Sequence, residues 1–393
     1  MFYSRISRIK VAGVILAGLS LVPASAQLKV SGQASTAFVR SGRGPSQYVY
    51  NEGRETFDWR LDIFADALLS ENITLLSNFR MLQDEIPHID LIALRISDVA
   101  STGITAEVGE IDIPFGNLGQ RRFPKTNPFL GLPLIREHRT TLRSSDYELW
   151  LADSRYTSAG NGVRILDQGL YDLGIKAGAS AGAFDFYAAI TNGMLSAASG
   201  YYQGGLNAHH GFGKTFRIAM TPVIGLTVGA SYAFGPFMSD AAYYGYPATT
   251  YRDPAEHLQQ IIGGDVDFSY EHFTFYGELA HNVWNLADSY GSDLSVTGYS
   301  LEGSYTFAPR FSVAARVGVL RFSTITTTLV QRDSLPALYT GGWDNDHVRL
   351  EGALGYRFTR EVAFKIVYEL NEEVSLASDP ADNVFAVQVV ATF

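Results

Sequence analysis

A run of basic side chains is the part of the sequence best suited to chemistry. It begins in the stretch PFGNLGQRRFPK, residues 114–125, and continues to residue 143. The cations are Arg121, Arg122, Lys125, Arg136, Arg139 and Arg143, and Glu137 is the carboxylate that opposes them. The chain as a whole has a formal net charge of −10, so positive charge is concentrated here. Fixed cations in a confined aqueous space raise the local concentration of anions, which predicts anion attraction at this segment.

Other groups of polar residues offer weaker candidates for metal binding. His209 and His210 are adjacent in a Gly-rich stretch, but a metal site needs further ligands within reach, so we interpret them as surface histidines. The stretches WDNDH (343–347) and NEEVSLASDPAD (371–382) supply carboxylates, yet they lack the ligand spacing of a defined calcium site. The sequence therefore predicts solvated loop charge there and no metal site.

Catalytic signatures are lacking in the sequence. A hydrolase would need a serine, a histidine and an acid together, and His281 and His347 are the histidines nearest to strand ends. No G-x-S-x-G motif marks a nucleophilic serine, and no phosphate-cradling loop or dinucleotide fingerprint is present. We therefore expect neither an enzyme nor a cofactor. The acidic net charge also argues against a nucleic-acid partner.

The elements that must position these residues are short segments of alternating polarity. In VRLEGALGYRF (348–358), Leu350 and Leu354 lie on one face, whereas Arg349, Glu351 and Arg357 lie on the other. Successive side chains of a strand point to opposite sides, so this pattern predicts strands with an apolar medium on one side and water on the other. Similar segments separated by turn residues run from end to end of the chain.

The links between these segments alternate between tight and long. The longest covers residues 112–163, and loops of that length are uncommon unless they are functional. The pattern predicts about 16 antiparallel strands. The alternation along each strand places the following charged side chains on the polar face, which would be the inner wall of a closed sheet: Arg60, Arg80, Arg95, Arg217, Arg316, Arg349, Arg357, Glu107, Asp267, Glu278, Glu302 and Glu351.

The beginning of the chain predicts export. Arg5, Arg8 and Lys10 precede a short apolar run, and Ala24-Ser25-Ala26 forms a small-residue cleavage signal. This pattern predicts a signal peptide over residues 1–26. The alternating segments predict a single barrel domain over residues 27–393. The apolar run is too short to span a bilayer comfortably, and no later run reaches the length of a membrane helix. An unpaired backbone polar group is costly in lipid, so a membrane-spanning sheet must close on itself.

The final segment, VFAVQVVATF, is an alternating strand that ends on Phe393. It resembles the C-terminal signature of Gram-negative outer-membrane β-barrels. The resemblance implies a transmembrane antiparallel barrel of the porin type in the bacterial outer membrane, in contact with lipid and lipopolysaccharide. It also implies passive diffusion of small hydrophilic solutes or anions through a water-filled channel, and a possible homotrimer. The third external loop of general porins folds into the lumen, and the link 112–163 resembles it. The PFG turn also resembles phosphate-selective (O/P-type) porins.

Alternatives remain open at the level of sequence. The basic segment could be an external loop whose arginines bind lipopolysaccharide phosphates or pair with an acidic wall. The barrel could instead be a scaffold that anchors or sheathes a secretion or electron-transfer partner, or a hydrolase with its site at the barrel rim. If the link 112–163 instead folds into the lumen, its basic side chains form a channel constriction.

Overall fold

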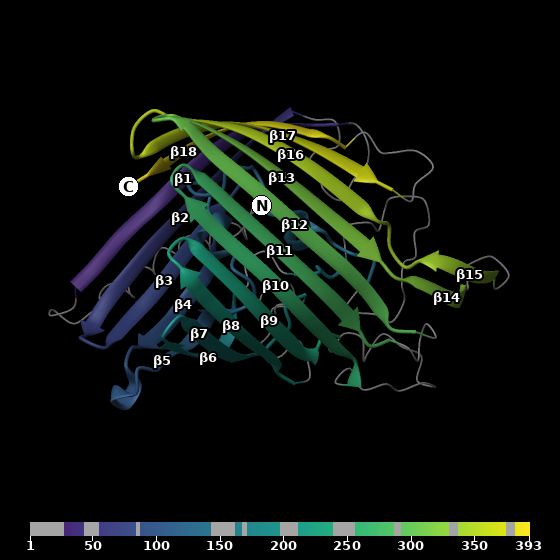
Figure 1. Ribbon diagram of the computed structural model, residues 1–393, viewed down its shortest axis with the longest axis horizontal. Helices are drawn as coiled ribbons and strands as arrows, with labels where there is room; N and C mark the ends of the chain where they lie inside the picture. Colours follow the sequence, from purple (N-terminus) through teal and green to yellow (C-terminus); the bar gives the residue numbers. More distant parts are fainter. Residues whose placement is uncertain are drawn as a thin grey trace, which may run out of the picture.

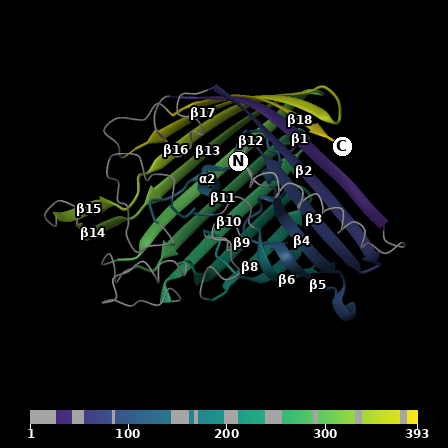
Figure 2. The ribbon, with the colours of Figure 1, turned by 180° about the vertical axis from the view of Figure 1, so that it is seen from behind.

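The computed structural model describes residues 27–42, 55–83, 87–142, 162–166, 171–196, 211–238, 256–286, 292–329, 337–374 and 382–393. Its main feature is one closed antiparallel barrel of 16 strands, which Figures 1 and 2 show from opposite sides. The predicted fold class and strand number are confirmed. The predicted signal peptide, residues 1–26, lies outside the described residues and stays a prediction.

The barrel strands follow one another around the wall in sequence order. Their bounds are β1 (Gln27–Ser41), β2 (Glu55–Ser70), β3 (Ile73–Leu82), β4 (His88–Ile96), β5 (Thr105–Asp112), β6 (Tyr171–Ala181), β7 (Phe184–Thr191), β8 (Gly213–Val223), β9 (Leu226–Pro236), β10 (Leu258–Tyr270), β11 (Phe273–Trp284), β12 (Leu294–Ala308), β13 (Phe311–Phe322), β16 (His347–Arg357), β17 (Val362–Glu373) and β18 (Val384–Thr392). Two more strands, β14 (Thr324–Leu329) and β15 (Ala337–Gly342), pair only with each other and form a hairpin between β13 and β16.

Alternating polarity sets which side of each strand faces outward. On β16, Arg349 and Glu351 are buried inside the barrel, whereas Leu350 and Leu354 are exposed on its outside. An outer surface of exposed apolar side chains facing away from buried charges is the arrangement of a barrel with lipid outside and water within. Among the described residues, no helix has the length and apolar character needed to cross a membrane.

Pairing between β1 and β18 closes the barrel. The ladder runs from Gln33 opposite Thr392 to Ser41 opposite Val384. Gly32 and Phe393 then exchange two backbone hydrogen bonds, each 3.0 Å long. Closure gives each barrel strand a paired neighbour on both sides, which limits the number of unpaired backbone groups in the wall.

Tight and long links alternate around most of the barrel, as the sequence indicates, but the β3–β4 link is shorter than the β4–β5 link. Two-residue turns join β6 to β7, β8 to β9 and β10 to β11 on one rim. The link between β4 and β5 on that rim is longer and carries the short helix η1 (Val99–Ser101). The opposite rim carries the longest link, between β5 and β6.

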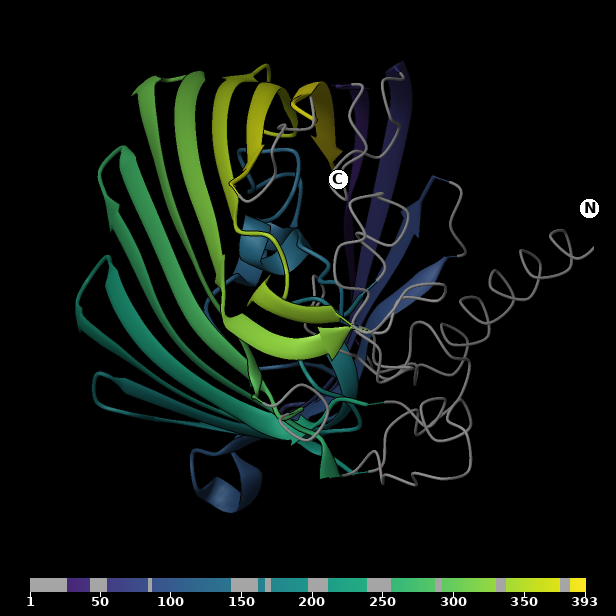
Figure 3. The ribbon, with the colours of Figure 1, turned by 90° about the vertical axis from the view of Figure 1, so that its right-hand side faces the viewer.

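The first part of that link, residues 113–142, is called the inner segment below. It contains the short helices η2 (Gly119–Arg122) and α2 (Leu134–Glu137). In Figure 3, α2 and the coil around it lie within the ring of strands. Apolar side chains of this segment, including Phe115, Leu134 and Ile135, join a buried cluster with Trp284 and Trp343 from the β11–β12 and β13–β16 sides of the wall.

Candidate functional site

Local hydrogen bonds fold the inner segment back on itself. The side chain of Asn127 donates to the carbonyl oxygen of Gly131 over 2.7 Å, and it accepts a hydrogen bond from the backbone N–H of Phe129 over 3.0 Å. Asparagine favours turns because its side chain can pair with the nearby backbone in this way. Glu137 in turn accepts a hydrogen bond from the backbone N–H of Leu132 over 2.7 Å. These bonds shape the stretch locally, without pairing it to a strand of the sheet.

Two cations of the wall hold the backbone of the same stretch. The buried ammonium group of Lys365 on β17 donates to the carbonyl oxygens of Pro124, Asn127 and Phe129, at 2.9, 2.8 and 3.3 Å. On β13, Arg316 donates to the carbonyl oxygen of Gly131 over 3.0 Å, and its guanidinium lies 4.3 Å from the ring centre of Phe129. These contacts attach the inner segment to the β13–β17 side of the wall.

Arg136 forms a fully buried ion pair with a residue of β11, which lies two strands away from β13 in the wall. Both nitrogens Nε and Nη2 of its guanidinium donate to the carboxylate of Glu278 on β11, with an Nε distance of 3.0 Å. The side chains are 0% and 1% exposed. Burial alone would lower the pKa of Arg136, but the carboxylate of Glu278 more than offsets that effect, and the pKa is raised. The pair therefore stays charged, and Arg136 serves as an anchor of α2.

Two more of the predicted basic residues also face carboxylates. Arg121 lies 2.9 Å from Asp267 on β10 and stacks over the ring of Tyr276. Arg122 lies 2.9 Å from Asp112 at the end of β5. Burial acts to lower the pKa of Arg122, yet the charge of Asp112 outweighs it and raises the pKa. The structure thus places both arginines against acidic partners.

The other predicted cations of this segment occupy different surroundings. Lys125 is exposed, and its backbone N–H donates to Gln33 on β1 over 3.1 Å. Arg139 is partly buried and forms an isolated backbone bridge with Arg164. Arg143 lies outside the described residues.

The predicted wall residues lie on the strands, and most of them face charges of opposite sign. The ion pairs are Arg60–Asp62 (2.8 Å), Arg80–Asp90 (3.1 Å), Arg95–Glu107 (2.7 Å), Arg217–Asp265, Arg316–Glu302 (3.5 Å), Arg316–Glu351 (2.5 Å) and Arg349–Glu137 (2.6 Å). Cross-strand neighbours of opposite charge neutralise one another. Arg357, by contrast, is an exposed side chain at the end of β16.

Two cavities lie between the inner segment and the wall. The first has a volume of about 660 Å³, and both signs of charge line it, among them Arg95, Glu107, Lys176 and Arg217. The second has a volume of about 570 Å³. Its charged lining is mainly basic: Lys125, Arg310, Arg357, Arg360, Lys365 and Glu361. Sequence reasoning missed Arg310 and Arg360 because they lie in turns, where strand alternation gives no direction.

Comparisons with known proteins rest on structure. No protein-family model matches the chain, and no curated protein sequence is significantly similar to it. The solved barrels that match this chain include three at 9–11% identity. The anion-selective porin from Comamonas acidovorans matches over 94% of this chain and 100% of its own, with a TM-score of 0.57. Salmonella typhi OmpF in complex with daunomycin matches over 93% and 97%, with a TM-score of 0.54. The trimer form of OmpT, an outer membrane protein of Vibrio cholerae, matches over 94% and 99%, with a TM-score of 0.53.

These matches extend over nearly the whole length of this chain, in which 16 strands form one closed antiparallel barrel. The chain therefore has the 16-stranded β-barrel fold of the outer-membrane porins.

Proposed function

We propose that this protein is an outer-membrane porin that lets small hydrophilic solutes diffuse passively. The observation that carries the proposal is the pair of charged cavities left between the inner segment and the wall of a barrel whose outer surface is apolar. A barrel of this strand number is too wide for its own side chains to fill, so an aqueous path is the physical expectation. The mechanism is selection by size and charge, without covalent chemistry.

The inner segment is proposed as the constriction of that path. Its backbone N–H groups at Lys125 and Gly116 donate to Gln33 on β1 and Ser231 on β9, which lie on opposite sides of the ring of strands. Lys365 and Arg316 hold it in between, so it narrows the lumen without being free to swing. Stiff backbone at Pro124, Pro128 and Pro133 supports the same role.

We further propose a preference for anions, carried chiefly by the second cavity. In the described part of the chain, Lys125, Arg310, Arg357 and Arg360 make no ion pair, whereas Arg121, Arg122 and Arg136 do. Unneutralised cations around a confined space attract anions more strongly than paired ones do. The anion-selective porin from Comamonas acidovorans has the same fold, which supports the proposal.

The surroundings follow from the same proposal. The apolar outer surface suits lipid, and we place the protein in the outer membrane, where lipopolysaccharide would be its neighbour. A homotrimer is proposed because OmpT of Vibrio cholerae, which shares the fold, has a trimer form.

Planar-bilayer recording tests the function directly. Purified protein is inserted into a bilayer, and the reversal potential is measured under a KCl gradient. We expect stepwise conductance and a reversal potential on the anion side. Changing Arg357 and Arg360 together to Ser is expected to lower the anion-to-cation permeability ratio, whereas Lys214→Ser, on the outer face of β8, is expected to leave it unchanged. Protein that inserts but passes no current would contradict the porin proposal and favour the scaffold alternative.

A further inference from the structure

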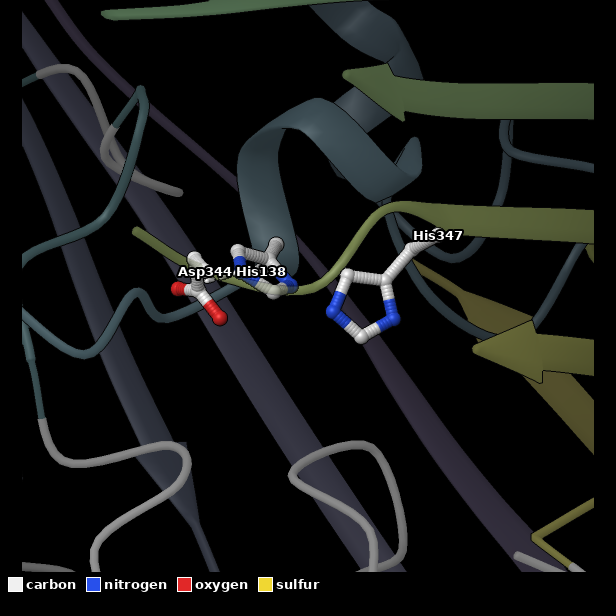
Figure 4. Close-up of side chains that lie close together, drawn as sticks. All are labelled: His138, Asp344 and His347. Atoms are coloured by element: carbon white, nitrogen blue, oxygen red, sulfur yellow. Dashed lines mark ion pairs between the residues drawn. The ribbon is translucent and has the colours of Figure 1, made fainter. Parts of the chain in front are cut away.

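Three buried side chains from distant parts of the chain converge beside the end of α2: His138, Asp344 and His347 (Figure 4). His138 directly follows α2, Asp344 lies between β15 and β16, and His347 begins β16. One possible ligand atom from each lies within 4.8 Å of the others. We propose that these side chains bind one divalent transition-metal ion, for which Zn²⁺ is the probe.

The donor set favours a transition metal over calcium or magnesium. Two imidazole nitrogens and one carboxylate oxygen are ligands that Zn²⁺ takes readily, whereas Ca²⁺ and Mg²⁺ take mainly oxygen. Bonds of about 2.1 Å in a tetrahedral site put ligand atoms roughly 3.4 Å apart. Small side-chain rotations therefore suffice to bring the three atoms around one ion, with water in the fourth position.

Two backbone hydrogen bonds fix the orientation of the Asp344 carboxylate, as is common for metal ligands. One carboxylate oxygen accepts the backbone N–H of Thr141 over 2.9 Å, and the other accepts the backbone N–H of Asn345 over 2.8 Å. An ionised carboxylate has about four lone-pair sites, so these bonds leave room for an ion. Partners of this kind fix the orientation of a ligand and strengthen metal binding.

The two imidazoles lie against each other in an enclosed pocket. Their ring centres are 4.5 Å apart, and the ring of His138 also packs 5.4 Å from that of Phe322. Glu373, a buried residue on β17, stands directly opposite His347 in the β16–β17 ladder. It therefore brings a second carboxylate next to His347, where it can orient that ring.

A bound ion would connect the inner segment to the link between β15 and β16. The ligands lie 206 and 209 positions apart in sequence, since His138 precedes Asp344 and His347 by those intervals. His138 Nε2 also lies 3.5 Å from Asp344 Oδ2, which is a contact that a metal-free pair can make as well. A metal site and a metal-free pair differ in one measurable respect. Only with a metal site does the stability of the fold depend on the metal concentration.

Calorimetric titration of ZnCl₂ into full-length, chelator-treated protein in detergent tests the site. His209 and His210 are adjacent in sequence and are changed to Ala in the background protein, so that they cannot contribute. We expect one saturable site. His138→Gln and His347→Gln are each expected to weaken it by about tenfold or more. The matched control is His272→Gln, in the exposed turn between β10 and β11, which should bind Zn²⁺ like the background protein.

A second measurement needs no variant in the site. Zn²⁺ should raise the thermal unfolding midpoint of the background protein, and chelator should reverse the rise, because a ligand that binds only the folded state stabilises it. Co²⁺ should give the visible absorption of a tetrahedral site. Absence of saturable binding, or of any metal effect on the unfolding midpoint, would overturn the proposal and leave a metal-free His138–Asp344 pair. Equal binding in both site variants would overturn it as well.

Discussion

Arg349 on β16 donates to Glu137 in α2 over 2.6 Å, although the two residues are 212 positions apart in sequence. The same guanidinium donates from Nε to the side chain of Asn371 on β17 over 2.8 Å. Glu137 itself accepts a backbone hydrogen bond from Leu132 within the inner segment. Glu137 thus connects the inner segment to β16 directly and to β17 through Arg349.

Breaking the buried pair between Arg136 and Glu278 is expected to destabilise the protein strongly. Arg136→Ala leaves the carboxylate of Glu278 buried without its partner, which costs about 3–5 kcal/mol in the free energy of unfolding. Denaturant unfolding followed by tryptophan fluorescence measures the loss. Arg321→Ala is the matched control, because the Arg321–Asp346 pair is half exposed and should change stability by about 1 kcal/mol or less. Equal losses in the two variants would show that the α2 anchor has no special weight.

Removing the ammonium group of Lys365 is expected to loosen the inner segment. Lys365→Met keeps the length of the side chain but deletes three hydrogen bonds to backbone carbonyls, at a cost of about 2 kcal/mol or more. Single-channel recording should show larger current fluctuations than in the parent protein. Lys214→Met, on the outer face of β8, should record like the parent. Quiet traces from Lys365→Met would mean that the other contacts hold the segment alone.

Replacing Arg121 is expected to change ion selectivity, because it leaves the carboxylate of Asp267 without its positive partner. Arg121→Ser leaves Asp267 without its cation, so the anion-to-cation permeability ratio should fall by about twofold. The reversal potential under a salt gradient gives the ratio. Arg40→Ser is the control, since the exposed pair of Arg40 and Glu55 lies at the rim with 68% and 60% of the side chains exposed. An unchanged ratio in Arg121→Ser would remove this residue from the proposed filter.

A methyl group at Gly32 is expected to impair closure of the barrel. A Cβ atom there would run into the ring of Phe393 and lie 2.8 Å from the carbonyl oxygen of Asp62, at the place where β1 meets β18. Gly32→Ala should therefore lower the yield of the folded form. Unheated gels measure this yield, because the folded barrel migrates differently from the heat-denatured chain. Gly352→Ala on β16 is the control, because a Cβ there meets no atom within 4 Å. Normal folding of both variants would show that the β1–β18 seam tolerates the change.

The sequence predicts the wall of this barrel well and its interior contacts poorly. Alternation in VRLEGALGYRF places Arg349 and Glu351 inside and Leu350 outside, and the structure agrees, because side-chain direction in a strand is a local property. The same rule assigns Glu278 to the inner wall. It does not pair Glu278 with Arg136, since that contact depends on how a loop 142 positions away folds.

The candidate sites show the same division between local pattern and long-range contact. The basic residues of the inner segment stand out in the sequence, but their neutralisation by Asp267, Asp112 and Glu278 does not. His347 and the acidic stretch 343–347 are visible as possible ligands, whereas the approach of His138 is set by the position of α2. Turn residues such as Arg360 carry no period at all, so their direction needs the structure.

The separate pairing of β14 with β15 has a practical consequence for protein engineering. The hairpin adds no rung to the barrel ladder, because β13 pairs directly with β16, while Ile325 near its base packs into the buried cluster. A peptide epitope grafted between Leu329 and Ala337 would thus be carried by two strands that take no part in the barrel ladder (Figures 1 and 2).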